Sequence, residues 1–404
     1  MDAKSIVKQY GQEQLLRYED KLSEAEKTSL YHQIESLDFS VLSEIEKKSS
    51  AKRGKITPLK AMELSEIETR HDELFKAGAD AIKAGKVGAV LLAGGMGTRL
   101  GSDNPKGMYN VGITKDLYIF ECLINNLMDV VKATDTYIPL FVMTSDLNYE
   151  STTAFFKEKK NFGYPDEYVF FFKQEMAPAC DYNGKVFLET PSKVAVSPNG
   201  NGGWFLSMMK SGMLEKAKQF GIEWFNIFAV DNVCQRICDP VFIGATILEK
   251  RTVGSKVVRK ADPFEKIGVM CLEDGTPSIV EYYELTDDMA YETDERGERV
   301  YNFGVILNYL FTVAEQEEIV NKSLPYHVVE KKIPYLDENG NAVKPEAPNG
   351  YKFEQLVLDM IHMASSCLPF EVVREKEFAP IKNKTGVDSV ESARELLKKN
   401  GVEL

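Results

Sequence analysis

Short apolar runs alternate with amphipathic segments through most of this 404-residue chain. The runs are GAVLLA at 88–93, YIPLFVMTS at 137–145, EYVFFF at 167–172, EWFNIFAV at 223–230 and SKVV at 255–258. The amphipathic segments lie around 115–133, 148–160, 203–219 and 240–250. Buried runs separated by helical patterns are typical of a mostly parallel sheet with helices on both faces. We therefore predict an α/β fold with a Rossmann-like, mostly parallel mixed sheet.

Turn and cap signals predict where several elements begin and end. Asp239-Pro240 and the capping box at 312–315 predict helix starts, and Glu273-Asp274-Gly275 predicts a β-hairpin over 266–285. A last short strand, EVVRE at 371–375, precedes a helix opened by Asp388, which has Glu391 three residues later.

Three regions are expected along the chain. Residues 1–84 contain leucines at three- and four-residue spacings and no convincing strand, so we predict an N-terminal helical region. The basic stretch 52–58 is expected to be a solvated linker. Residues 85–375 form the predicted central domain, and residues 376–404 form a short C-terminal loop and helix.

Charge and hydropathy exclude several classes of protein. The chain has 49 Lys and Arg against 62 Asp and Glu, a formal charge of −13, which argues against a nucleic-acid-binding protein. The longest uncharged stretches, such as 301–314, are shorter than the roughly 20 apolar residues that cross a bilayer, so no membrane association is expected. The N-terminus is charged throughout and does not resemble a signal peptide, and we expect a cytoplasmic protein.

The six cysteines are scattered among apolar segments and form no C-x-x-C pair. We predict that they are reduced thiols in the core. A zinc site at Cys234 and Cys238 is the alternative, but the remaining pair of ligands is missing.

A glycine-rich loop follows the first buried strand directly. It reads LAGGMGTRLG over 92–101, and Pro105-Lys106-Gly107 comes soon after. Glycines allow backbone N–H groups to approach phosphate oxygens closely, and a loop at the carboxyl end of a sheet strand is where α/β folds bind nucleotides. The loop therefore indicates phosphate binding.

The spacing of this loop excludes the two commonest phosphate-binding motifs. No glycine in it is followed by Lys-Ser or Lys-Thr, as a Walker A motif requires, and Leu100 stands where the dinucleotide fingerprint needs its third glycine. What remains is a loop with two cations, Arg99 and Lys106, available to one anion. The alternative is a glycine turn with two surface cations.

The pattern L-A-G-G-x-G-T-R-L-G followed by P-K-G resembles the signature of nucleotide-sugar pyrophosphorylases. Downstream motifs are similar to the UTP-using branch, and specifically to UDP-N-acetylglucosamine pyrophosphorylases. They occur in family order from about residue 11 to about 384 and include FFKQEMAPA, SPNGNGG, FAVDN, KADPFEKIGVM, SIVEYYEL, LPYHVVEKKIPY, PNGYKFEQLVLDM and FAPIKNK.

The resemblance implies a UTP site and a sugar site. Gln174 would read the uracil imide, because an amide both donates and accepts. The other predicted nucleotide-binding residues are Leu92, Ala93, Gly94, Gly95, Gly200, Asp231 and Lys352. The predicted hexosamine-binding residues are Asn201, Asn232, Gly268, Glu281, Tyr282 and Asn302. Alternatively, VEYYEL is simply a strand with Glu281 facing outward.

Phosphate and metal contacts complete the predicted site. Arg99 and Lys106 would hold the β- and γ-phosphates, and Lys382 would hold the sugar phosphate and the α-phosphate as they meet. Asp231 follows an apolar strand, and its carboxylate is the predicted ligand of a Mg²⁺ cofactor, since Mg²⁺ prefers carboxylate and phosphate oxygens. Lys352 and Lys382 are assigned from the resemblance, because lone lysines are ordinarily solvated.

The implied reaction is in-line attack of N-acetylglucosamine 1-phosphate on the α-phosphorus of UTP, with no covalent intermediate. The substrates are UTP and an N-acetylhexosamine 1-phosphate, and the enzyme is expected to be a monomer or weak homodimer. Alternatives are a UTP-dependent enzyme for glucose or galactose 1-phosphate, a broad UDP-sugar pyrophosphorylase, and a catalytically silent UDP-sugar-binding protein. A dehydrogenase is disfavoured by the glycine spacing. Family members usually continue into a further C-terminal domain, whereas this sequence stops at Leu404.

Overall fold

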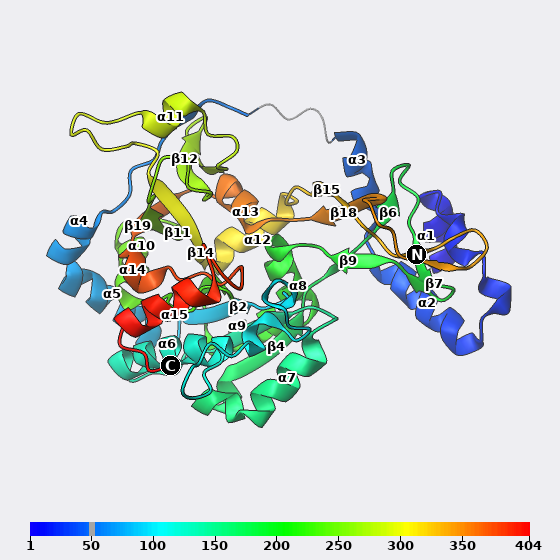
Figure 1. The fold of residues 1–404 in the computed structure, drawn as a ribbon, viewed down its shortest axis with the longest axis horizontal. Coiled ribbons are helices and arrows are strands. Elements are labelled where there is room, and N and C mark those ends of the chain that lie inside the picture. The colour runs from blue at the N-terminus through cyan, green and yellow to red at the C-terminus, as the bar shows by residue number, and fades with distance from the viewer. Residues whose placement is uncertain (48–52) are drawn as a thin grey trace. The chain divides into compact units, whose positions relative to one another are not determined.

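A computed structural model describes residues 1–47 and 53–404 (Figure 1). The described residues form two compact units, each built from three stretches of the chain. The first unit comprises the described residues of Met1–Lys52, Gln174–Gly203 and Leu324–Asp359, and the second comprises those of Arg53–Lys173, Trp204–Ser323 and Met360–Leu404. The units interleave along the chain, whereas the expected domains are contiguous. The boundaries at 84/85 and 375/376 stay a prediction.

The second unit contains the large mixed sheet that the sequence predicts. Its path runs β1-β12-β14-β10-β2-β3-β4, with β11 paired to β14 and β19, and β13 paired to β12. The four strands β10, β2, β3 and β4 are mutually parallel, and β14 runs antiparallel to β10. The strands are β1 Ile56–Pro58, β2 Val87–Leu92, β3 Leu140–Thr144, β4 Val169–Lys173, β10 Trp224–Ala229, β11 Val253–Arg259, β12 Val269–Glu273, β13 Thr276–Val280, β14 Phe303–Thr312 and β19 Cys367–Glu371.

Helices cover both faces of this sheet, as predicted. On one face, residues of α5 (His71–Lys83), α6 (Ile119–Thr134), α7 (Tyr149–Glu158), α10 (Pro240–Leu248) and α15 (Val390–Lys399) join one apolar cluster with Ala89 and Leu91 of β2. On the other face, Trp204 of α8 (Trp204–Lys210) packs against Phe225 of β10 and Phe311 of β14. Successive strand residues point to opposite faces, so both must be covered to bury such continuous apolar strands.

Shorter helices complete the second unit. They are α4 Leu64–Thr69, α9 Met213–Phe220, α11 Asp287–Tyr291, α12 Val313–Asn321 and α14 Arg374–Glu377. Helix α13, Val357–Met363, begins in the stretch of the first unit and ends in that of the second. Every helix in the described part of the chain is too short or too polar to span a bilayer.

The first unit has its own core of N-terminal helices and small sheets. Leu15, Leu30 and Ile34 pack with Phe353 in one apolar cluster. Helix α2 starts in a capping box, in which Ser23 and Glu26 satisfy each other's backbone N–H groups. The elements are α1 Ala3–Gln9, α2 Glu24–Ser36, α3 Glu44–Lys47, β5 Met176–Pro178, β6 Cys180–Asp181, β7 Leu188–Thr190, β8 Lys193–Val194, β9 Val196–Pro198, β15 His327–Lys331, β16 Tyr335–Leu336, β17 Ala342–Val343 and β18 Gly350–Glu354.

Several local predictions are confirmed. Strands β12 and β13 form the predicted hairpin, with positive φ at both Asp274 and Gly275. Asp239 and Thr312 cap α10 and α12 with their side-chain oxygens. All six cysteines are free thiols, and five of them are buried.

The predicted absence of strands before residue 84 is wrong. Ile56–Pro58 forms β1, because its backbone pairs with Cys271–Glu273 of β12. The expected solvated linker is also wrong where the structure describes it. Arg53 ion-pairs with Glu273 and Glu284 and donates to the Ile279 carbonyl, while Lys52 lies outside the described residues.

Two C-terminal boundaries also differ from the prediction. The strand predicted at 371–375 is β19, Cys367–Glu371, because the preceding residues pair with β11, and Arg374–Glu377 forms a helical turn instead. The last helix is capped by Ser389, whose hydroxyl accepts the Ser392 N–H. Asp388 has a φ of 52°, a left-handed conformation unlike the extended one of an N-cap residue.

Candidate active site

The glycine-rich loop lies at the carboxyl end of β2 and is closed by its own backbone. The Gly97 N–H donates to the Asn104 carbonyl at 2.8 Å, and the Lys106 N–H donates to the Gly95 carbonyl at 3.1 Å. The buried Asn148 amide donates to the Ala93 carbonyl at 2.9 Å. These bonds fold residues 93–107 back on themselves, so Arg99 and Lys106 are held in one compact loop.

Two glycines of this loop are required for different reasons. A Cβ on Gly107 would lie 2.2 Å from Cζ of Phe120, so the residue is needed for packing. A Cβ on Gly95 would meet no atom of the described residues within 4 Å, and Gly95 is exposed. Packing therefore does not account for Gly95, whereas close approach of a ligand to the backbone would.

Lys106 is surrounded by other charged groups of the second unit. Burial lowers the pKa of Lys106, Asp231 raises it, and Arg99 and Lys382 lower it. Lys106 has no ion pair among the described residues, although it is partly buried. The structure thus brings Arg99, Asp231 and Lys382, from three distant segments, within electrostatic reach of Lys106.

Asp231 and Lys382 come from segments that are hydrogen-bonded to each other. Asp231 follows β10, the parallel neighbour of β2, so its turn and the glycine loop lie at the same edge of the sheet. The Ile381 N–H donates to the Asp231 carbonyl at 2.9 Å. The Lys382 ammonium lies 2.9 Å from Asp388 Oδ2, and its side chain is 43% exposed.

A cavity of about 220 Å³ lies beside these two residues. Its polar part is lined by Asp231, Asn232, Glu265, Lys266, Lys382 and Asp388. Ile267, Ile306 and Phe378 belong to its apolar wall. The combination of an apolar wall and a few convergent polar groups is typical of small-molecule sites.

The side chain of Asp231 is a suitable ligand for a divalent cation. It forms no hydrogen bond or ion pair with any other residue that the structure describes, and it stands at the ligand-binding edge of the sheet. Mg²⁺ binds proteins through one or two carboxylates and completes its shell with water and substrate phosphates. A single carboxylate within electrostatic reach of Lys106 therefore fits Mg²⁺ without a larger acidic cluster.

Four of the predicted sugar-binding residues, Gly268, Glu281, Tyr282 and Asn302, lie around the ends of β12, β13 and β14. A Cβ on Gly268 would lie 3.4 Å from Glu281 Oε1, so these two residues are neighbours. Asn302 is buried, and its Oδ1 has no hydrogen-bond partner in the described part of the chain. Strand β13 ends at Val280 and Glu281 begins a turn, so the alternative of a strand continuing through VEYYEL is wrong. Tyr282 is 42% exposed in this turn.

The side chain of Asn232 is hydrogen-bonded within the protein. Its amide nitrogen donates to the Glu377 carbonyl at 2.8 Å, and its amide oxygen accepts the Ala379 N–H at 2.9 Å. The side chain is buried and both polar atoms are bonded to residues 377–379. Contact with a sugar stays a prediction for Asn232, and the observed bonds give it a role in holding that segment.

The remaining predicted residues belong to the first unit. Gln174 is buried, and burial lowers the pKa of Lys352 on β18. Gly200 has a φ of 89°, and a Cβ there would lie 2.3 Å from the Gln355 carbonyl oxygen. Asn201 Oδ1 accepts the Val357 N–H at the start of α13. Their roles toward nucleotide and sugar stay predictions.

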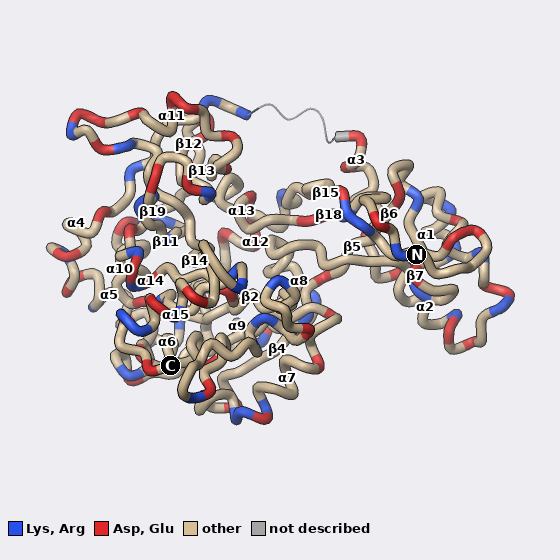
Figure 2. Tube along the Cα trace, in the orientation of Figure 1, with Lys and Arg blue, Asp and Glu red and all other residues tan. Residues whose placement is uncertain are grey.

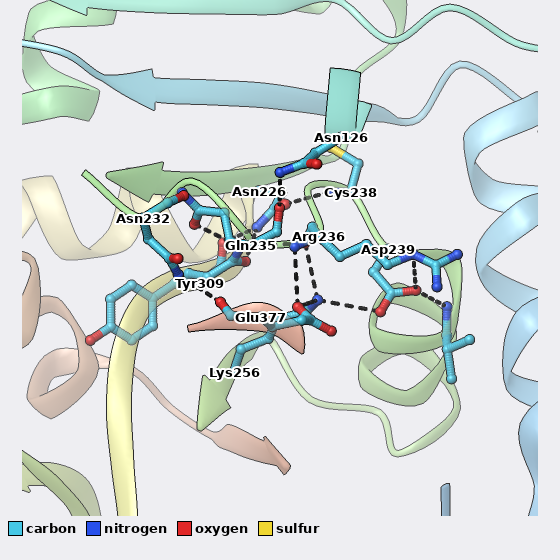
Figure 3. A network of polar contacts seen from close by, with 12 residues as sticks. Asn126, Asn226, Asn232, Gln235, Arg236, Cys238, Asp239, Lys256, Tyr309 and Glu377 are labelled. Carbon is cyan, nitrogen blue, oxygen red and sulfur yellow. Dashed lines mark hydrogen bonds and ion pairs between the residues drawn. The ribbon is translucent and has the colours of Figure 1, made fainter. Parts of the chain in front are cut away.

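Sequence reasoning missed a buried polar network beneath the 377–382 segment (Figure 3). Lys256 on β11 is fully buried and ion-pairs with Glu377 at 2.6 Å and Asp239 at 3.3 Å. From the sequence alone, Asp239 is expected only to cap a helix. A lysine inside the apolar run SKVV was the available signal, since lysine is almost never fully buried without a partner.

Charges of both signs are interspersed along both units (Figure 2). The net charge of the chain is −13. Cations for a polyanionic ligand therefore have to be supplied by local clusters such as Arg99, Lys106 and Lys382.

Known proteins resemble this chain along nearly its whole length. Residues 33–402 match the model of the family described as UTP–glucose-1-phosphate uridylyltransferase. The mouse UDP-N-acetylhexosamine pyrophosphorylase-like protein 1 is 36% identical over 96% of this chain and 81% of its own length. The Arabidopsis thaliana UDP-N-acetylglucosamine diphosphorylase 2 is also 36% identical, over 97% of this chain and 82% of its own length.

A solved structure has the same fold. The uridine diphosphate N-acetylglucosamine pyrophosphorylase of Trypanosoma brucei, in complex with an inhibitor, matches with a TM-score of 0.83 and 27% identity, over 97% of this chain and 83% of that one. The motifs, the sheet and these relatives agree along nearly the whole chain. The protein therefore belongs to the UTP–glucose-1-phosphate uridylyltransferase family, in its UDP-N-acetylhexosamine pyrophosphorylase group.

Proposed function

We propose that this protein is a uridylyltransferase that forms UDP-N-acetylglucosamine and pyrophosphate from UTP and N-acetylglucosamine 1-phosphate. The observation that carries the proposal is the cluster of Arg99, Lys106, Lys382 and Asp231 at the carboxyl edge of the sheet. Two reacting anions must meet there, and a chain of charge −13 offers few such places. The names of the relatives supply the substrate class.

The chemistry is a displacement at phosphorus. An oxygen of the sugar 1-phosphate attacks the α-phosphorus of UTP, a new phosphorus–oxygen bond forms, and the bond to the β-phosphate bridging oxygen breaks, releasing pyrophosphate. The attacking oxygen is already an anion at neutral pH, so no protein base is needed. Catalysis then depends on positioning and on charge stabilisation.

The three cations of the site contact different phosphate groups in this proposal. Arg99 and Lys106 hold the β- and γ-phosphates, where negative charge grows as pyrophosphate leaves. Lys382 holds the sugar phosphate and the α-phosphate as they approach each other. Burial lowers the pKa of Lys106, and a bound phosphate favours the ammonium form again.

Asp231 is the residue that would hold Mg²⁺. The bound cation would neutralise phosphate charge and help to orient the triphosphate. The fit of the unpaired Asp231 carboxylate to this role supports the assignment of Mg²⁺ as the cofactor.

The other proposed roles follow the resemblance. Gln174 reads the uracil imide, and Leu92, Ala93, Gly94, Gly95 and Gly200 surround the base and ribose, while Lys352 assists on the UTP side. Asn201, Asn232, Gly268, Glu281, Tyr282 and Asn302 contact the hexosamine. The free Oδ1 of buried Asn302 supports a donor hydroxyl or amide of the sugar at this position. We also propose a cytoplasmic enzyme that is a monomer or weak homodimer.

One competing function has support from the comparisons. The description of the matching family names glucose 1-phosphate as the substrate. The second candidate is therefore an enzyme that prefers glucose 1-phosphate or accepts several sugar 1-phosphates. The test is pyrophosphate release from UTP and Mg²⁺, measured in parallel with N-acetylglucosamine, N-acetylgalactosamine, glucose and galactose 1-phosphates. We expect the highest kcat/KM with N-acetylglucosamine 1-phosphate. A higher value with glucose 1-phosphate would favour the second candidate, and no release with any sugar would favour a silent UDP-sugar-binding protein.

A further inference from the structure

The ammonium of Lys256 is completely satisfied inside the protein. It lies 2.6 Å from Glu377 Oε2, 3.3 Å from Asp239 Oδ2 and 3.0 Å from the Arg236 carbonyl oxygen. These three acceptors match the three N–H donors of a lysine ammonium. The side chain has no exposed surface, and those of Asp239 and Glu377 are only 6% and 14% exposed.

Such a buried ionic group is a poor means of stabilising a fold. Removing two carboxylates and an ammonium from water is costly, and an apolar replacement of similar volume is often equally stable. Buried polar networks are better at specifying one arrangement of the segments they join. The position of the segments joined by Lys256 therefore matters.

The network joins the turn after β10 to the segment 377–382. Asp239 caps α10 at the end of the turn, and the Arg236 N–H donates to Glu377 at 3.2 Å. Asn232 bonds to both Glu377 and Ala379, and it also forms an isolated bridge with Pro380. Figure 3 shows Glu377 and Lys256 at the centre of these contacts, below the turn.

Both ends of this connection carry residues of the proposed site. Asp231 is adjacent to Asn232, and its carbonyl accepts the Ile381 N–H. Lys382 follows Ile381, which is buried. A shift of Glu377 would move Lys382 relative to Asp231, and loss of precise placement lowers the rate of a reaction that depends on positioning.

We propose that Lys256 is a positioning residue for uridylyl transfer, which acts through Glu377 to hold Lys382 beside Asp231. This inference rests on the proposed function. Lys256 does not contact a substrate and is not a catalytic residue. The glycine loop is closed by separate backbone hydrogen bonds, so we expect its binding of UTP not to depend on Lys256.

The first test is the Lys256→Met variant in the full-length protein. We expect kcat to fall about tenfold or more while KM for UTP changes less than about threefold. Amide hydrogen exchange should become faster in residues 377–390 and stay unchanged in residues 93–107. A wild-type kcat together with unchanged exchange in 377–390 would overturn the proposal.

A double-mutant cycle distinguishes positioning from a general loss of stability. If Lys256 acts through Lys382, adding Lys256→Met to Lys382→Ala should lower kcat by less than about threefold further. A full additional tenfold loss would show that Lys256 acts elsewhere. Phe156→Leu is the control for a general loss of stability, since Phe156 is a fully buried residue of α7. This variant should lower the thermal midpoint of unfolding but leave kcat within about twofold of the wild type.

Glu377→Gln provides a second route if Lys256→Met does not fold. Glutamine keeps an acceptor for the Arg236 N–H and removes the charge facing Lys256, so we expect about a threefold fall in kcat and faster exchange in 377–390. A soluble Glu377→Gln variant with wild-type kcat and exchange would contradict the proposal. If the wild type released no pyrophosphate, the proposed function would fail, while hydrogen exchange would still decide whether Lys256 holds the segment.

Discussion

Two loops of the second unit carry the cations of the proposed site, and they differ in how far they depend on other segments of the chain. The glycine loop 93–107 is closed by hydrogen bonds within its own backbone and by a few neighbours such as Asn148. The segment 377–388 is held at its start by other segments, through the Asn232 amide and through Lys256, which ion-pairs with Glu377 and Asp239. Its end closes on itself, because the Lys382 N–H donates to the Asp388 carbonyl at 2.7 Å.

The difference extends to the lysines themselves. Lys106 has no ion pair within the described residues, and its pKa is lowered by burial. Lys382 is 43% exposed and is paired with Asp388 at 2.9 Å. The glycine loop thus presents Lys106 without a counter-ion among the described residues, whereas Lys382 stays paired with the nearby Asp388 until another anion replaces it.

The largest expected effect compares the two lysines directly. Lys106→Ala and Lys382→Ala should each lower kcat by about 100-fold, since each removes charge stabilisation from the transition state. If the loops serve different substrates, the first should mainly raise KM for UTP and the second KM for the sugar 1-phosphate. Steady-state pyrophosphate release with each substrate varied checks this, and identical KM changes for both variants would contradict the division of roles.

The next effect concerns geometry within the glycine loop. Arg99→Lys keeps the charge but loses the planar fork that holds a phosphate through two hydrogen bonds, and we expect kcat to fall about tenfold with the fold intact. Arg99→Ala is the control and should fall further. Equal activity of Arg99→Lys and the wild type would show that Arg99 contributes charge alone.

Two glycine substitutions separate packing from ligand approach in the same loop. Gly107→Ala brings a Cβ to within 2.2 Å of Phe120 and should reduce the free energy of unfolding by about 2–3 kcal/mol. The Cβ of Gly95→Ala meets no atom within 4 Å in the part of the chain that the structure describes, so the change should leave stability unchanged while raising KM for UTP about fivefold. Denaturant unfolding and UTP titration measure the two effects, and destabilisation by Gly95→Ala would refute the contrast.

The smallest expected effect is at the counter-ion of Lys382. Asp388→Asn removes a charge that competes with the sugar phosphate, so KM for the sugar 1-phosphate should fall by about twofold. Stability should drop by no more than about 0.5 kcal/mol, because the pair is partly exposed. A raised KM would indicate that Asp388 orients Lys382 instead of competing for it.

The sequence by itself determined the features that are encoded in contiguous residues. The apolar runs at 88–93 and 223–230 became the adjacent parallel strands β2 and β10, and GGMGTRLG became a closed loop at their carboxyl ends. Burial on both faces and the conformational demands of glycine act over a few neighbouring residues, so they can be read locally. The family motifs added Lys352 and Lys382, which lie too far along the chain for any local pattern to assign.

Only the tertiary structure decided how distant segments are joined. The motif predicts sugar contact for Asn232, yet its amide is bonded to residues 377–379. Lys256 is fully buried because Asp239 and Glu377 pair with its ammonium. The short strand at 56–58 forms because its backbone pairs with β12. Side chains more than a hundred residues apart meet only after the sheet has formed, and burial then determines which charges must be paired.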